Sequence, residues 1–218
     1  SIEKETFGGM EEWIRLVAHG LQARGHLALV AGRPGSEFLR RVTKSDVETI
    51  SLDISGDFNP VTITRLRQLL RQRRIDLVCV NFNKDVRLGG LAARFAGSIP
   101  VVWSVGLDVT SDSWANRQLT PRLIDSVIVP SESLKRQITA RGYIGGEMVS
   151  VIPIGIHDDP RAMRSREAAQ ALRSELNLSP EALIAVTIGR FVEQKGHTIL
   201  IDALPEIVAR IPNVRFLF

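Results

Sequence analysis

Short apolar runs without polar alternation recur along the chain, and stretches with helical periodicity separate them. The predicted strands are residues 27–31, 48–52, 76–80, 100–104, 126–130, 148–152, 183–188 and 214–218. A strand that is apolar on both faces must be covered on both faces, as happens in a parallel sheet with helices on either side. The pattern therefore predicts an α/β fold built on a doubly wound parallel sheet.

The stretches between these runs place their apolar residues at helical spacing. The predicted helices are residues 10–25, 61–74, 87–97, 131–142, 166–178 and 197–211. The fourth of them opens at Ser131 or Ser133, either of which is suited to cap a helix N-terminus, and ends at Gly142.

A cluster of turn-forming residues in "PIGIHDDP" predicts a domain boundary. We assign residues 1–158 to an N-terminal domain and residues 159–218 to the beginning of a second α/β domain. The second part holds only two predicted strands, which are too few to bury a stable core. The first part opens on a helix, whereas this fold normally opens on a strand. The sequence therefore predicts a fragment that lacks the first strand and most of the second domain.

Composition restricts the partners and the compartment. The formal net charge is +4 and arginine supplies most of the positive charge, which favours an anionic partner. The sequence has no apolar run long enough for a transmembrane helix and no secretion signal at its start. The single cysteine, Cys79, lies in a strand predicted to be buried and can form no internal disulfide. These features predict a cytoplasmic protein.

The segment "GRFVEQKG", from Gly189 to Gly196, joins a predicted strand to a predicted helix. Ligands of parallel α/β sheets bind at the carboxyl ends of the strands, and a helix N-terminus there attracts anions. With Arg190 and Lys195, this junction is expected to hold a dianion such as a diphosphate without a metal ion. The alternative is that both cations are solvated charges at a tight turn. For His197, packing at the helix start is favoured over phosphate contact.

A second glycine pair, Gly8 and Gly9 in "FGGMEEW", directly precedes the first predicted helix. Glycine lets the backbone approach a ligand closely, and the helix start again favours an anion. The alternative is an ordinary glycine-rich helix entry.

Four segments in register resemble the GT-B glycosyltransferases of family 4. They are "FGGMEEWIRLVAHGLQARGHLALVAG", "SVIVPSESLKRQI", "VSVIPIGIH" and "IGRFVEQKGHTILIDAL". The resemblance covers nearly the whole chain. It implies a Rossmann-like N-terminal domain on the acceptor side and the start of a Rossmann-like domain that binds the nucleotide sugar.

The resemblance also implies roles for individual residues. Arg190 and Lys195 of the G-R-x-x-x-x-K-G motif bind the diphosphate of the donor, beside Gly189, and act in catalysis by stabilising the leaving group. Gly8 and Gly9 approach the donor phosphates or the acceptor. Family members retain the anomeric configuration and generally need no metal, and the sequence shows no cluster with metal-ligand spacing. No cofactor is expected.

The chain departs from the family pattern at three places. Gly106 stands where many members have a histidine that contacts the transferred sugar. Members that act on lipopolysaccharide core have G-L-D here, so Asp108 becomes a candidate catalytic contact to the sugar or acceptor, against the alternative of a turn aspartate. Ile154 stands where the family has asparagine. The family's E-x7-E motif is missing, so this polypeptide alone is expected to have little or no activity.

Two further groups bear on the acceptor. Asn83 and Lys84 follow a strand end and could bind a polar acceptor, or belong to an ordinary capped loop. The arginines of the second predicted helix form a dense basic face: Arg65, Arg67, Arg71, Arg73 and Arg74. A solvated face is the favoured reading, and contact with an anionic membrane surface or a lipid-linked acceptor is the alternative.

Together these features predict a retaining glycosyltransferase. It would transfer a hexose or heptose from a nucleotide diphosphate sugar to a saccharide or lipid-linked acceptor, in envelope polysaccharide or lipopolysaccharide synthesis, in the cytoplasm or at the inner face of the membrane. The alternatives are a sugar-nucleotide epimerase on a similar scaffold and a noncatalytic sugar-nucleotide-binding fragment. No nucleic-acid partner is expected, and no G-x-G-x-x-G follows a strand as a dehydrogenase would require.

Overall fold

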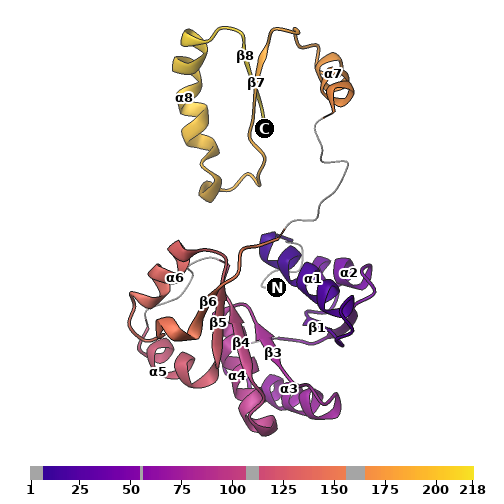
Figure 1. The fold of residues 1–218 in the computed structure, drawn as a ribbon, viewed down its shortest axis with the longest axis vertical. Helices are drawn as coiled ribbons and strands as arrows, with labels where there is room; N and C mark the ends of the chain where they lie inside the picture. The colour runs from indigo at the N-terminus through magenta and orange to yellow at the C-terminus, as the bar shows by residue number, and fades with distance from the viewer. Residues whose placement is uncertain (1–6, 55, 107–112, 156–164) are drawn as a thin grey trace. The chain divides into compact units, whose positions relative to one another are not determined.

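The computed structural model describes residues 7–54, 56–106, 113–155 and 165–218. The chain divides into two compact units, Ser1–Ile156 and His157–Phe218. Figure 1 shows the elements of each unit in chain order. Among the described residues, no helix is long and apolar enough to cross a lipid bilayer.

The first unit alternates helices and strands. Its elements are α1 (Gly9–Gln22), β1 (Leu29–Gly32), α2 (Glu37–Thr43), β2 (Glu48–Ser51), α3 (Pro60–Gln72), β3 (Val78–Val80), α4 (Asn83–Gly97), β4 (Val101–Ser104), α5 (Trp114–Leu123), β5 (Ser126–Val129), α6 (Glu132–Thr139), the 3-10 turn η1 (Gly146–Met148) and β6 (Val149–Val151). Every strand lies at a predicted position, and the predicted α/β class is confirmed.

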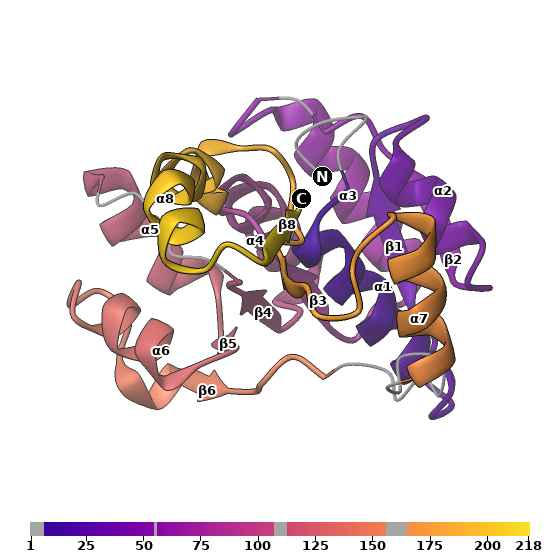
Figure 2. The same ribbon diagram turned by 90° about the horizontal axis from the view of Figure 1, so that it is seen from above.

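All strand pairs of this unit are parallel, but they form two sheets. One contains β1 and β2, and the other has the order β3-β4-β5-β6 (Figures 1 and 2). Within the described residues no strand pairs with the second edge of β1 or of β3, so these edges keep unpaired backbone groups. The expected single sheet is therefore divided in this structure.

The exposure of Cys79 follows from this division. Val78 and Val80 point toward α4, because a side chain added at Gly89 would meet their methyl groups. Successive strand residues point to opposite faces, so Cys79 lies on the other face, at an edge strand, and is exposed. The expectation that this strand is buried on both faces is wrong at Cys79.

The main core lies between the four-stranded sheet and the helices α3 to α6. Trp103 on β4 is its largest fully buried side chain, with 1% of its surface exposed. Its indole Nε1 donates a hydrogen bond of 3.3 Å to the carbonyl oxygen of Asn81, just beyond the end of β3. A smaller core joins α1, β1 and α2 around Phe38. The cores therefore fix the carboxyl ends of the strands.

Two helices, α2 and α5, were absent from the sequence prediction. Both have a serine N-cap, since Ser36 accepts a hydrogen bond from the Leu39 amide and Ser113 accepts one from the Asn116 amide. The first is only 7 residues long, and the second contains Pro121, which normally argues against a helix interior. The sequence did not predict α2 because it is short, and it did not predict α5 because it contains a proline.

The predicted cap of α6 is confirmed at Ser131, whose hydroxyl accepts a hydrogen bond of 3.2 Å from the Leu134 amide. The helix ends at Thr139, before the predicted Gly142, which forms part of the turn that follows with a φ of 77°. That positive φ favours glycine, so the residue marks the exit of the helix and not its last turn.

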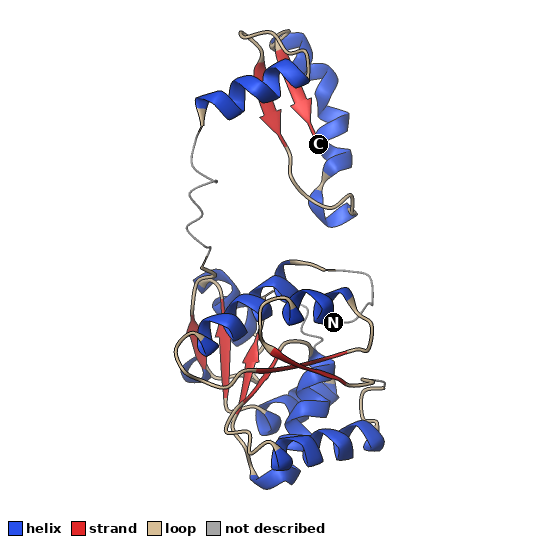
Figure 3. Ribbon diagram, turned by 90° about the vertical axis from the view of Figure 1, so that its right-hand side faces the viewer, coloured by secondary structure: helices blue, strands red, loops and turns tan. Residues whose placement is uncertain are grey.

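The second unit is small. It contains α7 (Arg166–Glu175), β7 (Leu183–Val186), the 3-10 turn η3 (Glu193–Lys195), α8 (His197–Arg210) and β8 (Val214–Leu217). β7 and β8 form a two-stranded parallel sheet, visible in Figure 3. Among its described residues only Ala182, His197 and Val214 are buried.

Candidate functional site

In the second unit, the segment Gly189–Gly196 folds back on itself before α8. Its last residues form η3, and Gly196 adopts a φ of 66° that connects the turn to the helix. The aliphatic stem of Lys195 passes beside Gly189, where an added Cβ atom would lie 3.5 Å from its Cγ. The fold therefore brings the strand end, the lysine and the start of α8 together, as the sequence predicted for this junction.

His197 holds this turn in place through its buried ring. It is buried, and its ring Nε2 lies 2.9 Å from the carbonyl oxygen of Arg190. The ring also packs against Phe191 at a centroid distance of 4.8 Å and against Phe218 at 6.2 Å. His197 is thus a packing and positioning residue, which agrees with the reading that the sequence favoured.

The side chains of Arg190 and Lys195 are exposed. Within the part of the chain that the structure describes, no acidic side chain lies at ion-pair distance from either of them. Two uncompensated cations beside a helix N-terminus create a local positive potential that suits a doubly charged anion.

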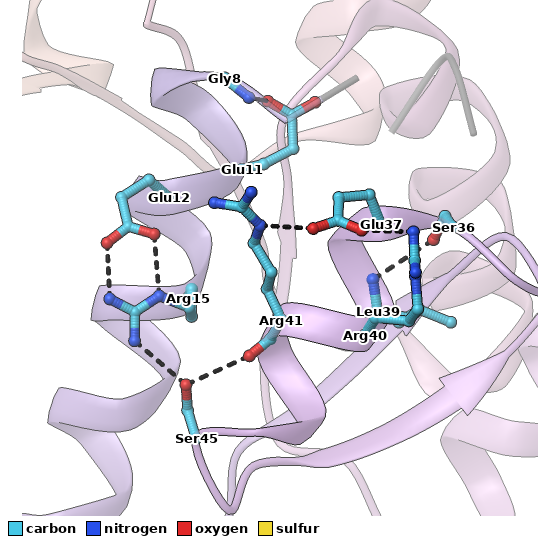
Figure 4. A network of polar contacts seen from close by, with 10 residues as sticks. All are labelled: Gly8, Glu11, Glu12, Arg15, Ser36, Glu37, Leu39, Arg40, Arg41 and Ser45. Atoms are coloured by element: carbon cyan, nitrogen blue, oxygen red, sulfur yellow. Dashed lines mark hydrogen bonds and ion pairs between the residues drawn. The ribbon is translucent and has the colours of Figure 1, made fainter. Parts of the chain in front are cut away.

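In the first unit, the amide of Gly8 is already engaged. It donates a hydrogen bond of 3.1 Å to Oε2 of Glu11, which is buried one turn into α1 (Figure 4). An anion could take this amide only after Glu11 moved away. At Gly9, by contrast, an added side chain would meet nothing within 4 Å. Packing therefore gives no reason for glycine there, which leaves room for a ligand to approach the backbone.

A hydrogen-bonded bridge through Ser45 joins α1, which carries this glycine pair at its start, to the end of α2. Arg15 donates to Glu12 at 2.8 Å and to the hydroxyl of Ser45 at 3.0 Å, and Ser45 donates to the carbonyl of Arg41 (Figure 4). Arg41 in turn contacts Glu37 at 2.7 Å. The N-terminus of α1 is thereby anchored to α2.

Polar side chains gather where β1 and β3 end. Lys84, in the first turn of α4, donates from Nζ to the carbonyl of Ile54 at 3.4 Å, and Arg33, just after β1, donates to the same oxygen at 3.2 Å. Asn83 is the first residue of α4. The structure therefore brings Lys84 together with Arg33, which the sequence analysis did not single out. Its signal was its place two residues after the strand predicted at residues 27–31.

Asp108 lies outside the described residues. The neighbouring Gly106 is described, at the carboxyl end of β4. A Cβ atom added there would lie 2.2 Å from the terminal methyl of Met10 on α1. Met10, Trp13 and Gly106 line a hollow together with the ends of β5 and β6. A histidine at Gly106 would displace Met10.

Asp85 caps α4 by accepting a hydrogen bond of 3.2 Å from the Phe82 amide, and burial raises its pKa. A raised pKa means that ionised Asp85 costs stability, increasingly as the pH rises from the ordinary aspartate value of about 3.9 through the shifted value. Asp85→Asn keeps an acceptor but removes the charge. We expect its unfolding free energy, relative to the wild type, to rise between pH 3.5 and pH 7. Urea unfolding at both pH values measures this, and a relative stability that falls with pH would contradict it.

The basic face of α3 is largely used within the protein. Arg67 and Arg71 donate to the carbonyls of Phe95 and Ala96 at the end of α4, at 2.9 and 3.0 Å. Arg73 pairs with Glu48 at 2.6 Å. Cations at a helix C-terminus complement its dipole. These arginines therefore have structural partners that the sequence analysis did not foresee.

The described residues contain no group of three or more histidine, cysteine, aspartate or glutamate side chains arranged to hold a metal ion.

Comparison with known proteins gives one family match and several structural matches. Residues 7–160 match the model of Glycosyltransferase Family 4. No curated protein sequence matches the chain. Among solved structures, a glycosyltransferase from Rickettsia africae ESF-5 superposes with a TM-score of 0.77 at 16% identity, over 98% of this chain and 66% of that one.

Two other solved structures are informative. Anabaena Alr3699/HepE in complex with UDP-glucose gives a TM-score of 0.77 at 22% identity, over 97% of this chain and 57% of that one. A UDP-N-acetylglucosamine 2-epimerase (so described) from Listeria monocytogenes gives 0.58 at 18% identity, over 97% and 60%. The chain spans less than two thirds of the length of these proteins. At such identities the matches show the fold alone, the GT-B type of α/β architecture that the sequence predicted.

Proposed function

The chain belongs to Glycosyltransferase Family 4, and from that membership we propose that it forms part of a retaining transferase that uses a nucleotide diphosphate sugar. The observation that carries the proposal is the pair Arg190 and Lys195. Both are exposed, unpaired with any described carboxylate, and adjacent to the start of α8. The complex of Alr3699/HepE with UDP-glucose supports a nucleotide sugar as the ligand.

The chemistry of transfer explains why cations are needed there. As the glycosidic bond breaks, negative charge grows on the departing diphosphate. Fixed positive groups aimed at that charge stabilise the transition state more than the ground state. His197 holds the carbonyl of Arg190 and so restricts the backbone that carries the arginine. Gly8 and Gly9 would bring backbone amides to the donor or acceptor, with Glu11 moving from Gly8 when an anion binds.

The acceptor would bind the first unit, at the ends of β1 and β3 where Asn83 and Lys84 lie. We propose a saccharide or lipid-linked acceptor, a hexosyl or heptosyl donor, and a place in envelope polysaccharide synthesis. Asp108 stays a proposed contact to the sugar or acceptor. Peripheral contact with an anionic membrane also stays a prediction, and three of the five arginines of the predicted helix 61–74 already have partners within the protein: Arg67, Arg71 and Arg73.

The epimerase is the second candidate, because the Listeria monocytogenes protein of that description shares the fold. An epimerase converts one nucleotide sugar into another with no acceptor. Transfer instead consumes the donor only when an acceptor is present. The intact enzyme is incubated with a UDP-sugar, first alone and then with a pooled saccharide acceptor. Conversion of the UDP-sugar without acceptor indicates an epimerase, and consumption only with acceptor indicates a transferase.

A screen of nucleotide sugars by thermal shift tests the proposal directly. We expect at least one UDP- or GDP-sugar to raise the melting temperature, because a ligand at 100 times its Kd adds about 3 kcal/mol to the free energy of unfolding. The shift should be unchanged in EDTA, because the proposed diphosphate site uses side-chain cations. The corresponding monosaccharides without nucleotide serve as controls. Shifts that require Mg²⁺ would contradict the metal-free site, and a complete lack of shift would contradict the donor site.

A further inference from the structure

Three cations, here called the strand-end cations, gather at the carboxyl ends of β1 and β3: Arg33, Lys84 and Arg87. Arg33 directly follows β1, and the other two lie in the first turns of α4 (Figure 1). Arg33 and Lys84 both donate to the carbonyl oxygen of Ile54, at 3.2 and 3.4 Å. Because they share one acceptor atom, the two charged groups stand side by side.

Within the described residues the charge of this pair is only partly offset, by the electrostatic attraction between Lys84 and the Asp85 carboxyl. No carboxylate among the described residues lies at ion-pair distance from Arg33 or Lys84. Both side chains are only partly exposed, and Nε of Arg33 is buried without a hydrogen-bond partner. A single neutral carbonyl does not offset two like charges, so their repulsion is left in place in a partly desolvated setting.

The nearby carboxylates of Asp57 and Asp85 already accept hydrogen bonds from other groups. Asp57 pairs with Arg87 at 2.5 Å, and the same guanidinium donates to Oδ1 of Asn116 at 2.8 Å. The carboxyl of Asp85 accepts the Phe82 amide at 3.2 Å, and burial raises its pKa. Arg87 is thereby held in position, with the ring of Phe58 at 5.7 Å from its guanidinium carbon. Arg87 lies three residues after Lys84 on α4, so the two are neighbours on that helix, and the charge of Arg87 is already paired with Asp57.

A neutral sugar needs hydroxyl-binding amides and carboxylates, and it gives no reason to hold two cations together. An oxyanion does, because the arginine fork and the lysine ammonium both satisfy its oxygen atoms. We propose that the strand-end cations bind a phosphate or carboxylate group of the acceptor, which makes the acceptor an anionic saccharide or a phosphate-bearing lipid-linked one. This inference rests on the proposed function, in which the acceptor binds the first unit.

The test uses the whole chain, saturated with UDP so that the proposed donor site is filled. Methyl phosphate and glucuronate are titrated separately, and the arginine Nε–H signals are followed by ¹⁵N NMR. The Arg33 signal is assigned by its loss in Arg33→Gln. We expect saturable shifts of the Arg33 and Arg87 signals with one or both probes. The probe that binds more tightly distinguishes a phosphate ester from a uronic-acid carboxylate.

A variant pair checks the assignment. Arg33→Gln with Lys84→Gln should weaken binding of the probe by about tenfold or more. Arg136→Gln with Lys44→Gln removes the same charge from exposed positions of the same unit, on α6 and just after α2, and should leave binding within about twofold. Signals of Arg33 that stay unmoved by both probes, or equal binding by the two double variants, would overturn the proposal.

The proposed donor site and the proposed acceptor site are tested separately. UDP affinity is measured first by calorimetry on the wild type and on both double variants. Lack of UDP binding defeats the proposed donor site, whatever the probes do. Intact UDP binding with no probe binding at Arg33 defeats only the anionic acceptor.

Discussion

Arg190→Ala is expected to reduce sugar transfer by roughly 30- to 1000-fold, because it removes one fixed cation from the departing diphosphate at a cost of about 2–4 kcal/mol in the transition state. The effect should appear in kcat and in kcat/KM together, since the charge grows only as the bond breaks. Steady-state kinetics of the intact enzyme with its nucleotide sugar measure it. The side chain is exposed, so stability should change little.

A matched control lies on the next helix. Arg210 is exposed at the end of α8 and pairs with Glu206 at 2.7 Å. Arg210→Ala removes the same charge from the same unit and should leave turnover within about twofold, because exposed ion pairs contribute little. Equal activity of the Arg190→Ala and wild-type proteins would remove the basis of the proposed donor site.

Trp103→Ala is expected to destabilise the first unit by about 3–5 kcal/mol, because it removes the largest fully buried side chain and leaves a cavity under β4. The melting temperature of that unit should fall by roughly 10 °C or more. The change also removes the indole hydrogen bond to the Asn81 carbonyl, at the strand end where the acceptor is proposed to bind. Calorimetric unfolding of the wild type and the variant measures the loss.

The chain provides a second tryptophan as the control. Trp114, at the start of α5, has 77% of its surface exposed. Trp114→Ala should change the unfolding free energy by less than about 0.5 kcal/mol. Similar losses in the two variants would mean that Trp103 does not hold the core, and that the strand ends depend on other contacts.

The strands were predictable because each is a short apolar run, and every described strand lies at most one residue outside its predicted segment. The junction from Gly189 to Gly196 was predictable for the same reason, since two glycines and two cations between a strand and a helix are local features. Helix α2 was missed because its 7 residues give too little periodicity, although the Ser36 cap was present. Helix α5 was missed because Pro121 argues against a helix interior.

Local order along the chain determined the α/β class, the positions of the strands, and the place of Arg190 and Lys195 at a strand end. Periodicity and turn residues are properties of neighbours in sequence, so they can be read without a structure. Only the tertiary structure decided that Arg33 and Lys84 share the carbonyl of Ile54, and that Arg67 and Arg71 donate to carbonyls at the end of α4. These contacts join residues 21 or more positions apart, and packing alone brings such residues together.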